Sequence, residues 1–351
     1  MMGKISLLDC TLRDGGYLND WRFGEEAISG ILHRVESSDV EIVEMGFLKN
    51  EPFESGRAVF NSMQQIKELV REKKPGTLYA LMCELVNPVP AERLEPCDGI
   101  GADILRMILW KTKRLPDGRT VDALDEGYDY CKAIVDKGYR LCVQPVRVNQ
   151  YSDEEFTALM RRFAELAPMA IYVVDSWGTQ NEEELLHYMR LADKVLPKEI
   201  ALGHHGHNNL MQTPGVAKAM LREGFKRDII LDASVFGIGR GAGNLSLELI
   251  AKYMNEHCGK SYAIPPMLEV YEQYLKEIFN KESWGYSIPF FLTASYNCNP
   301  MYARYLGKEL GQDADTIRYV LTHLSAESKI VYNRAEADQC LEKYRQSKSR
   351  V

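Results

Sequence analysis

The sequence predicts an α/β protein of the (β/α)8, or TIM-barrel, class with a helical C-terminal extension. Eight short apolar runs alternate with amphipathic segments from the start of the chain to about residue 260. Eight strand-then-helix units suit such a barrel in number and in length. The Gly-x-Gly-x-x-Gly fingerprint of a doubly wound open sheet does not follow the first run. Around Pro265-Pro266 the alternation ends, and only helical patterns follow.

The predicted strands are short apolar runs bounded by polar or glycine-containing segments. They span Lys4–Asp9, Glu41–Gly46, Thr77–Cys83, Asp103–Ile108, Arg140–Val146, Ala170–Asp175, Ala201–His205 and Ile229–Phe236. The predicted helices between them cover residues 25–36, 59–73, 124–137, 153–166, 181–195, 213–223 and 244–256. Ser152 and Asn181, each followed by acidic residues, are typical helix N-caps. The stretch 84–102 is irregular and carries no clear helical pattern.

Beyond the barrel, helical patterns without intervening strands cover residues 267–280, 300–310, 313–324 and 335–346. We therefore expect two domains. The first is a barrel of residues 1–262, and the second is a helical extension of residues 263–351 packed on it.

Composition restricts the function. The 351 residues carry a formal net charge of −7, which argues against a general binder of nucleic acid or acidic membranes. Eight cysteines occur without a Cys-x-x-Cys pair, and several lie in apolar runs where a reduced thiol is expected. No signal-peptide pattern opens the chain, and no apolar run approaches the roughly 18 residues of a membrane span. We expect a cytoplasmic protein.

The segment Gly203–Leu210 contains three of the seven histidines of the chain. Side chains two residues apart in a strand point to the same face, so His205 and His207 can share one metal ion. His204 points the other way if the strand continues. An isolated His-x-His is equally typical of polar loop residues, and a metal site therefore requires partners from elsewhere in the chain.

Such partners occur where the predicted strands end, which is where a barrel of this class places its chemistry. Asp14 precedes two glycines after the first strand, and Glu44, Asp175-Ser176 and the loop Gly237–Asn244 follow other strands. Two imidazoles, one carboxylate and one amide oxygen suit a divalent metal. This donor set favours manganese or magnesium, with cobalt and zinc as alternatives. Such a metal can hold a 2-oxo acid, and Arg13 would supply positive charge to a developing enolate.

Three motifs together resemble the DRE-TIM metallolyase superfamily. They are Thr11–Gly15, His205-x-His207 with Asn209-Leu210, and the glycine-rich loop Gly237–Asn244. The superfamily includes 4-hydroxy-2-oxovalerate aldolase, 3-hydroxy-3-methylglutaryl-CoA (HMG-CoA) lyase, and the isopropylmalate and homocitrate synthases. The resemblance covers roughly residues 3–260, with the motifs in the expected order, and it is closest to the aldolase.

The resemblance implies roles for individual residues. Asp14, His205 and His207 would be metal ligands. Asn244 matches an asparagine that is a metal ligand in some members and a near neighbour of the metal in others, and it is predicted as the fourth ligand. Arg13 matches an arginine that polarises the substrate carbonyl and stabilises the enolate. Glu44 matches a catalytic-site glutamate that hydrogen-bonds near the metal or near that arginine.

Departures from the family pattern concern the substrate. Tyr17 replaces a histidine that serves as acid or base in the aldolase, so Tyr17 is predicted to act in catalysis and, with Ser176, to line the substrate pocket. The synthases have Glu-Gln where this chain has Gly16-Tyr17. The CoA-ester lyase has a cysteine in the loop that reads Gly239-Arg240-Gly241 here. Biotin-dependent carboxyltransferases need a carbamylated lysine where Val174 stands, which excludes that branch.

The extension contains Trp284–Phe291, which resembles a segment in the communication domain of the aldolase. That domain contributes a tyrosine near the active site and leads toward a partner aldehyde dehydrogenase. Tyr286 is therefore a predicted substrate-binding residue, and a dehydrogenase is a predicted partner.

The expected function is that of a divalent-metal-dependent aldolase or lyase. It would cleave or form a carbon–carbon bond in a 2-oxo acid through a metal-stabilised pyruvate enolate. One alternative is a Claisen-type acyltransferase of the isopropylmalate or homocitrate synthase type, and another is a non-catalytic barrel that binds a metal or a partner. We expect a homo-oligomer that acts on small molecules and binds neither nucleic acid nor membrane.

Overall fold

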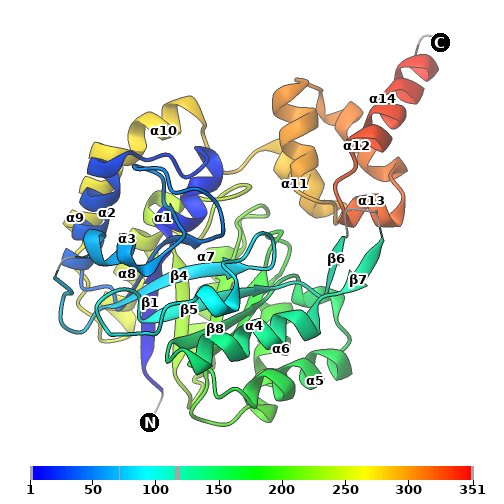
Figure 1. Cartoon of the computed structure of the whole chain (residues 1–351). Coiled ribbons are helices and arrows are strands. Elements are labelled where there is room, and N and C mark those ends of the chain that lie inside the picture. The colour runs from blue at the N-terminus through cyan, green and yellow to red at the C-terminus, as the bar shows by residue number, and fades with distance from the viewer. Residues whose placement is uncertain (1–2, 71, 115–118, 349–351) are drawn as a thin grey trace.

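The computed structural model describes residues 3–70, 72–114 and 119–348 and confirms the predicted (β/α)8 barrel (Figure 1). Its parallel strands are β1 Ile5–Asp9, β2 Ile42–Leu48, β4 Leu78–Glu84, β5 Ile104–Leu109, β8 Arg140–Pro145, β9 Ala170–Asp175, β10 Ala201–Gly206 and β11 Ile229–Ala233. They pair in this order around the barrel. Pairing of β1 with both β2 and β11 closes the sheet. The two predicted domain ends, residues 1–2 and 349–351, lie outside the described residues.

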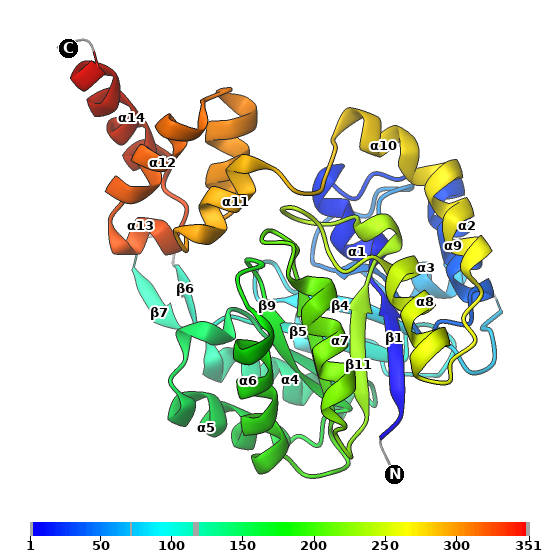
Figure 2. The same cartoon turned by 180° about the vertical axis from the view of Figure 1, so that it is seen from behind.

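Helices cover the outside of the barrel, as Figures 1 and 2 show from opposite sides. They are α2 Glu25–Ser37, α3 Met63–Leu69, α4 Leu124–Asp136, α5 Asp153–Ala164, α6 Glu182–Val195, α7 Thr213–Glu223 and α8 Leu247–His257. The helices α5 and α6 begin at capping boxes, in which the side chains of Ser152 and Asn181 accept hydrogen bonds from Glu155 N and Glu184 N. The predicted N-caps are thus confirmed.

Alternation along each strand divides the apolar side chains between two cores. One core fills the barrel, with residues such as Leu8, Ile42 and Tyr172, and the other lies between barrel and helices. Gly203 shows how closely the interior is packed. A Cβ at this position would lie 2.4 Å from the ring of Tyr172, so β10 requires glycine there.

Three predicted elements were partly wrong. The predicted helix 59–73 shortens to α3, because Val59–Phe60 form β3, a strand that pairs with the end of β2. Residue 71 of that prediction lies outside the described residues. The strand predicted to reach Phe236 ends at Ala233, and Val235–Gly237 form the turn η4. The helix predicted from residue 244 begins at Leu247, because Asn244 and Ser246 make strand-like bridges instead.

Short elements in the loops were not predicted. The loop after β1 forms the helical turns α1 Thr11–Asp14 and η1 Gly15–Leu18, which carry several predicted site residues. Two further turns are η2 Ala91–Arg93 and η3 Val148–Gln150. An antiparallel hairpin of β6 Thr112–Arg114 and β7 Thr120–Asp122 follows β5. In both views this hairpin reaches toward the C-terminal helices (Figures 1 and 2).

The C-terminal segment is helical, as predicted. It contains α9 Ile264–Val270, η5 Tyr271–Leu275, α10 Lys276–Lys281, α11 Ile288–Ser295, η6 Ala303–Glu309, α12 Ala314–His323, α13 Ala326–Ile330 and α14 Arg334–Lys348. The first of these helices pack on α2, where Arg34 lies 3.2 Å from Glu269 and donates to Tyr274 Oη. The later helices share a separate apolar core that includes Leu292, Leu306 and Leu321.

The predicted boundary at residues 262 and 263 falls directly before α9, and the division into two domains remains a prediction. Among the described residues, no helix combines the length and apolar character that crossing a membrane requires.

Candidate metal centre

The predicted metal ligands come together at the carboxyl ends of the strands. Asp14 ends α1, directly after β1, while His205 lies in β10 and His207 follows that strand. Asn244 reaches the same place through a strand-like bridge with His207. Ligand atoms of Asp14, His205 and His207 all lie within 4.8 Å of one another. The two imidazole rings are 5.2 Å apart at 89°, and all four side chains are buried.

His204 takes no part in this cluster. Its Nδ1 lies 2.9 Å from the carbonyl oxygen of Val173, on the opposite face of β10 from His205. Burial lowers the pKa of His204 to about 4, so the ring is neutral near pH 7. The alternation of the strand therefore separates a structural histidine from the two candidate ligands.

The donor atoms at the centre fit a divalent cation. Asn244 Nδ2 donates to the carbonyl oxygen of Ile238 over 3.0 Å, while its Oδ1 is buried without a hydrogen-bond partner. The Nδ1 of His207 is likewise buried and unpartnered. Buried acceptors without donors are costly unless something else satisfies them. A Cβ at Gly239 would lie 2.3 Å from Asn244 Nδ2 and 2.7 Å from Asp14 Oδ1, so glycine is needed for these groups to approach.

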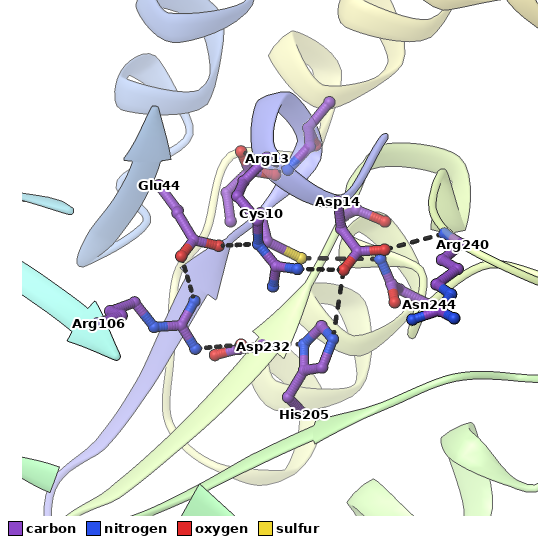
Figure 3. Close-up of polar contacts among 12 residues, drawn as sticks. Cys10, Arg13, Asp14, Glu44, Arg106, His205, Asp232, Arg240 and Asn244 are labelled. Atoms are coloured by element: carbon purple, nitrogen blue, oxygen red, sulfur yellow. Dashed lines mark hydrogen bonds and ion pairs between the residues drawn. The ribbon is translucent and has the colours of Figure 1, made fainter. Parts of the chain in front are cut away.

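Arg13 connects the ligands to a buried network of charges (Figure 3). Its Nη1 forms an ion pair with Asp14, and its Nε donates to Glu44 Oε2 over 2.8 Å. The other oxygen of Glu44 lies 2.8 Å from Nη1 of Arg106, a residue in the middle of β5. Glu44 therefore orients Arg13 from behind, and its own carboxylate is held between two guanidinium groups.

The network closes into a ring through β11. Arg106 Nη2 forms an ion pair with Asp232, whose Oδ2 lies 3.0 Å from Nδ1 of His205. Nε2 of the same imidazole lies 3.4 Å from Oδ2 of Asp14. Positive and negative groups thus alternate around most of the ring, so that neighbouring groups of opposite sign compensate the buried charges.

The electrostatics set protonation states that suit metal binding. Burial alone would raise the pKa of Asp14, but Arg13, His207 and His205 outweigh it and hold that pKa well below its usual range. Burial lowers the pKa of His207 to about 3, so its imidazole is neutral near pH 7. Burial opposes the charge of His205 as well, but Asp14 and Asp232 outweigh it and raise the pKa. Near neutral pH the centre therefore offers the ionised carboxylate of Asp14 and the neutral imidazole of His207, and His205 would have to release any proton on its ligating nitrogen when a metal binds.

A cavity opens next to the cluster, and its lining includes several predicted substrate-binding residues. Its polar lining comprises Arg13, Tyr17, Glu84, Gln144, Ser176 and Arg240, together with Asp14 and the two histidines. Nη2 of Arg13 is buried without a hydrogen-bond partner. The hydroxyl oxygen of Ser176 accepts a hydrogen bond from Arg147 N over 3.1 Å, which leaves its own proton available.

Tyr17 is half-buried against aromatic neighbours. Its ring lies 4.9 Å from that of Trp21 and 6.3 Å from that of Phe47, and the guanidinium of Arg240 lies 5.8 Å from the ring centre. Burial, assisted by the negative charge of Glu84, raises the pKa of Tyr17 to about 12. The phenol is therefore protonated near neutral pH and is available as a hydrogen-bond donor or an aromatic wall.

Besides the candidate ligand Asn244, two predicted residues lie outside the lining. Glu44 is fully buried behind Arg13, where it positions the guanidinium. Tyr286 is 53% exposed, and its nearest aromatic neighbour is Phe291, 6.4 Å away in α11. The structure thus does not bring Tyr286 together with the other site residues.

Three residues near the site were missed in the sequence. Arg106 and Asp232 lie inside strands, where a single charge within an apolar run is the only signal of a buried ion pair. Glu84 ends β4, and its carboxylate lies 2.6 Å from Lys49 Nζ. Catalytic residues of this fold lie at the carboxyl ends of strands, and Glu84 is at such an end. It was missed because the third strand was predicted to stop at Cys83, one residue earlier.

Comparison with known proteins supports the family resemblance that the sequence motifs indicate. The HMGL-like family model matches residues 118–271. A 4-hydroxy-2-oxovalerate aldolase of Geobacillus genomosp. 3 is 22% identical over 254 residues, which are 72% of this chain and 70% of the relative.

Solved structures share the fold. The N-terminal domain of a candidate aldolase from Bacteroides vulgatus has a TM-score of 0.70 at 21% identity, covering 87% of this chain and 98% of that one. The carboxyl transferase domain of Rhizobium etli pyruvate carboxylase has a TM-score of 0.66 at 14% identity, covering 98% of this chain and 62% of that one. The barrel, the ordered motifs and the similarity to the aldolase together support placing the chain in the DRE-TIM metallolyase superfamily, as an aldolase-like carbon–carbon lyase.

Proposed function

We propose that this lyase is a divalent-metal-dependent aldolase that breaks or forms the C3–C4 bond of a 4-hydroxy-2-oxo acid, with pyruvate as the three-carbon product. One observation carries the proposal. Arg13, whose Nη2 is buried and unpartnered, lines the same cavity as the cluster of Asp14, His205 and His207. The activity named for the Geobacillus relative supports the same reaction.

Asp14, His205, His207 and the free Oδ1 of Asn244 would hold the cation. Nitrogen and oxygen donors without a thiolate favour manganese or magnesium, with cobalt and zinc as alternatives. Cys10 lies 3.8 Å from Asn244 Nδ2, but burial raises the pKa of its thiol well above the usual value, so it offers no thiolate. When bound, the metal would supply Lewis acidity to the keto and carboxylate oxygens of a 2-oxo acid.

Arg13 would stabilise the charge that develops on the keto oxygen. The guanidinium is fixed by Glu44 and Asp14 on two of its nitrogens, which leaves Nη2 for the substrate. Because this donor is already oriented and shielded from water, no reorganisation is needed as the enolate forms. A neutral Tyr17 and the Ser176 hydroxyl would line the rest of the substrate pocket.

Glu84 is the carboxylate of the cavity that lies outside the metal cluster, and we assign it as the proton acceptor. In the cleavage direction the 4-hydroxyl proton passes to Glu84, and the C3–C4 bond breaks as the C4–O bond becomes an aldehyde carbonyl. The bonding electron pair remains with C3 and forms the enolate of pyruvate. Transfer of a proton from water to C3 then yields pyruvate, and Glu84 releases its own proton to the solvent.

Proton exchange tests this proposal directly. The purified protein with Mn²⁺ should exchange the methyl protons of pyruvate for deuterium, and should release pyruvate from a panel of 4-hydroxy-2-oxo acids. Both reactions should stop with a chelator and in the His207→Ala variant. Absence of exchange and cleavage in protein shown to bind Mn²⁺ would refute the proposal.

The acyltransferase alternative predicts a different product. Release of free thiol from acetyl-CoA in the presence of a 2-oxo acid would replace the aldolase assignment with a Claisen condensation. The homo-oligomer and the aldehyde dehydrogenase partner remain predictions, which light scattering and co-purification can test.

A further inference from the structure

A second pocket adjoins the metal cavity, and Tyr17 and Arg240 line both. Its far wall belongs to the C-terminal extension, through η6 and the start of α11. Figures 1 and 2 show these helices on the side of the barrel where the loops after the strands gather. The second pocket has a volume of about 390 Å³, against about 60 Å³ for the metal cavity. Of these two, the second pocket is the one that lies in the size range of ordinary small-molecule sites.

The walls of the second pocket combine apolar surface with hydroxyl groups. The apolar part comes from Leu18, Pro289, Phe290 and Met301, and Ser283 and Ser287 add polar atoms. This lining suits the body of a molecule longer than pyruvate. A ligand that starts at the metal centre and passes Tyr17 and Arg240 would place its distal end here.

The charge of the second pocket is positive, although the whole chain carries −7. Lys308 and Glu282 form an ion pair and neutralise each other. Arg240 and Arg304 also line the pocket, and within the described part of the chain neither guanidinium has a carboxylate at ion-pair distance. The N-terminus of α11 opens onto the same space through Ser287 and Phe290, which adds partial positive charge.

Arg240 links the two cavities, because it lines both of them. Its backbone N–H donates to Asp14 Oδ1 over 2.9 Å, while its side chain lies against Tyr17 and faces the second pocket. A ligand group bound by the Arg240 side chain would therefore lie on a residue whose backbone contacts the candidate metal ligand Asp14.

We propose that the second pocket binds the aldehyde-derived end of the substrate, and that this end carries an anionic group, a carboxylate or a phosphate, on an apolar segment. The inference rests on the proposed aldolase function and extends it to a substrate class. Arg304 and Arg240 would pair with the anion, and the apolar wall would cover the chain between the anion and the reacting carbon.

Matched acceptor aldehydes test this inference in the synthesis direction. With pyruvate and Mn²⁺, succinic semialdehyde is compared with butanal, and glyceraldehyde 3-phosphate with glyceraldehyde. The charged member of at least one pair should have a kcat/KM about tenfold or more above its neutral partner, and the pair that responds identifies the anion. The Arg304→Gln variant should lower this ratio about tenfold, because it removes a charged hydrogen bond.

Arg318→Gln is the matched control, because Arg318 lies on α12 in the same extension, pairs with Asp315 and does not line the pocket. Deuterium exchange into pyruvate should be unchanged in Arg304→Gln. Normal exchange with equal kcat/KM for charged and neutral acceptors, or an unchanged ratio in Arg304→Gln, would overturn the inference.

Failure of the aldolase proposal is recognised separately by the absence of pyruvate exchange. In that case calorimetric titration of the metal-free protein with glutarate and with glycerol 3-phosphate still tests the pocket. Binding of either anion that weakens about tenfold in Arg304→Gln supports an anion site, and no binding of either contradicts it.

Discussion

Oδ2 of Asp232 lies 3.0 Å from Nδ1 of His205, while Nε2 of the same ring lies 3.4 Å from Oδ2 of Asp14 (Figure 3). Two carboxylates therefore contact opposite edges of one imidazole. With the ring proton on Nδ1 facing Asp232, the lone pair of Nε2 is directed to the side of Asp14. Carboxylates of this kind fix the tautomer of a metal-binding histidine and raise its basicity.

Asp232→Asn should weaken Mn²⁺ binding about 10- to 100-fold, because the amide no longer holds the imidazole tautomer by charge. Calorimetric titration with Mn²⁺ measures the effect. The control is Asp228→Asn, an exposed residue directly before the same strand, whose Oδ1 accepts from Lys4 N. Equal Mn²⁺ affinity in Asp232→Asn and in the unmodified protein would contradict this positioning role.

Arg13→Lys should lower the rate of pyruvate exchange by about 10²- to 10³-fold, since lysine cannot contact Glu44, Asp14 and a substrate oxygen with one planar group. The affinity for Mn²⁺ should change less than tenfold, because Arg13 donates no metal ligand. NMR measurement of exchange at saturating Mn²⁺ separates the two effects. An exchange rate within threefold of normal would exclude Arg13 from enolate stabilisation.

The barrel was predictable because parallel strands buried on both faces read as continuous apolar runs. In β9 all six residues are buried, and the first five, Ala170 to Val174, form such a run. Asp14, His205 and His207 were predictable because short motifs at strand ends carry them. Arg106 and Asp232 were not, because they lie within strands. Their pairing depends on how β5 and β11 face each other across the closed barrel, and no local pattern contains that information.

Loop structure was the least predictable part. The helical turn that carries Arg13 and Asp14 has only four residues, which is too short for a periodic pattern. Asn244 was predicted at the start of a helix but lies in a strand-like bridge with His207, where its Oδ1 is left for a ligand. Tyr286 was placed by resemblance alone, and the direction of an exposed loop side chain depends on tertiary contacts that the sequence does not show.

Glu84→Gln should abolish aldol cleavage while it leaves pyruvate exchange within about threefold of normal, because the hydroxyl proton is transferred only when the C3–C4 bond is cleaved. Coupled detection of pyruvate gives the cleavage rate, and NMR gives the exchange rate. Lys49 loses its partner in this variant, so Lys49→Met serves as the control for the broken ion pair. Equal loss of both reactions would assign Glu84 to the enolisation step instead.

Because of Asp9, the free energy of unfolding should decrease as the pH rises from about 4 to about 7. Burial raises the pKa of Asp9 from 3.8 to about 7, although Thr11 donates to its carboxylate from both the backbone N and the hydroxyl. The folded chain therefore holds a proton that the unfolded chain has already released. Stability falls as pH rises wherever the folded state binds more protons, by about 4 kcal/mol at most across this window.

Urea unfolding of the unmodified protein and of Asp9→Asn at several pH values isolates this effect. The amide cannot ionise but can still accept one hydrogen bond from Thr11, so the difference in stability between the two proteins should shift toward the variant as pH rises from 4 to 8. The exposed Asp228→Asn variant controls for the loss of one acidic side chain. A difference that stays constant over this range would mean that the Asp9 carboxyl is ionised throughout, and that the hydrogen bonds from Thr11 outweigh its burial.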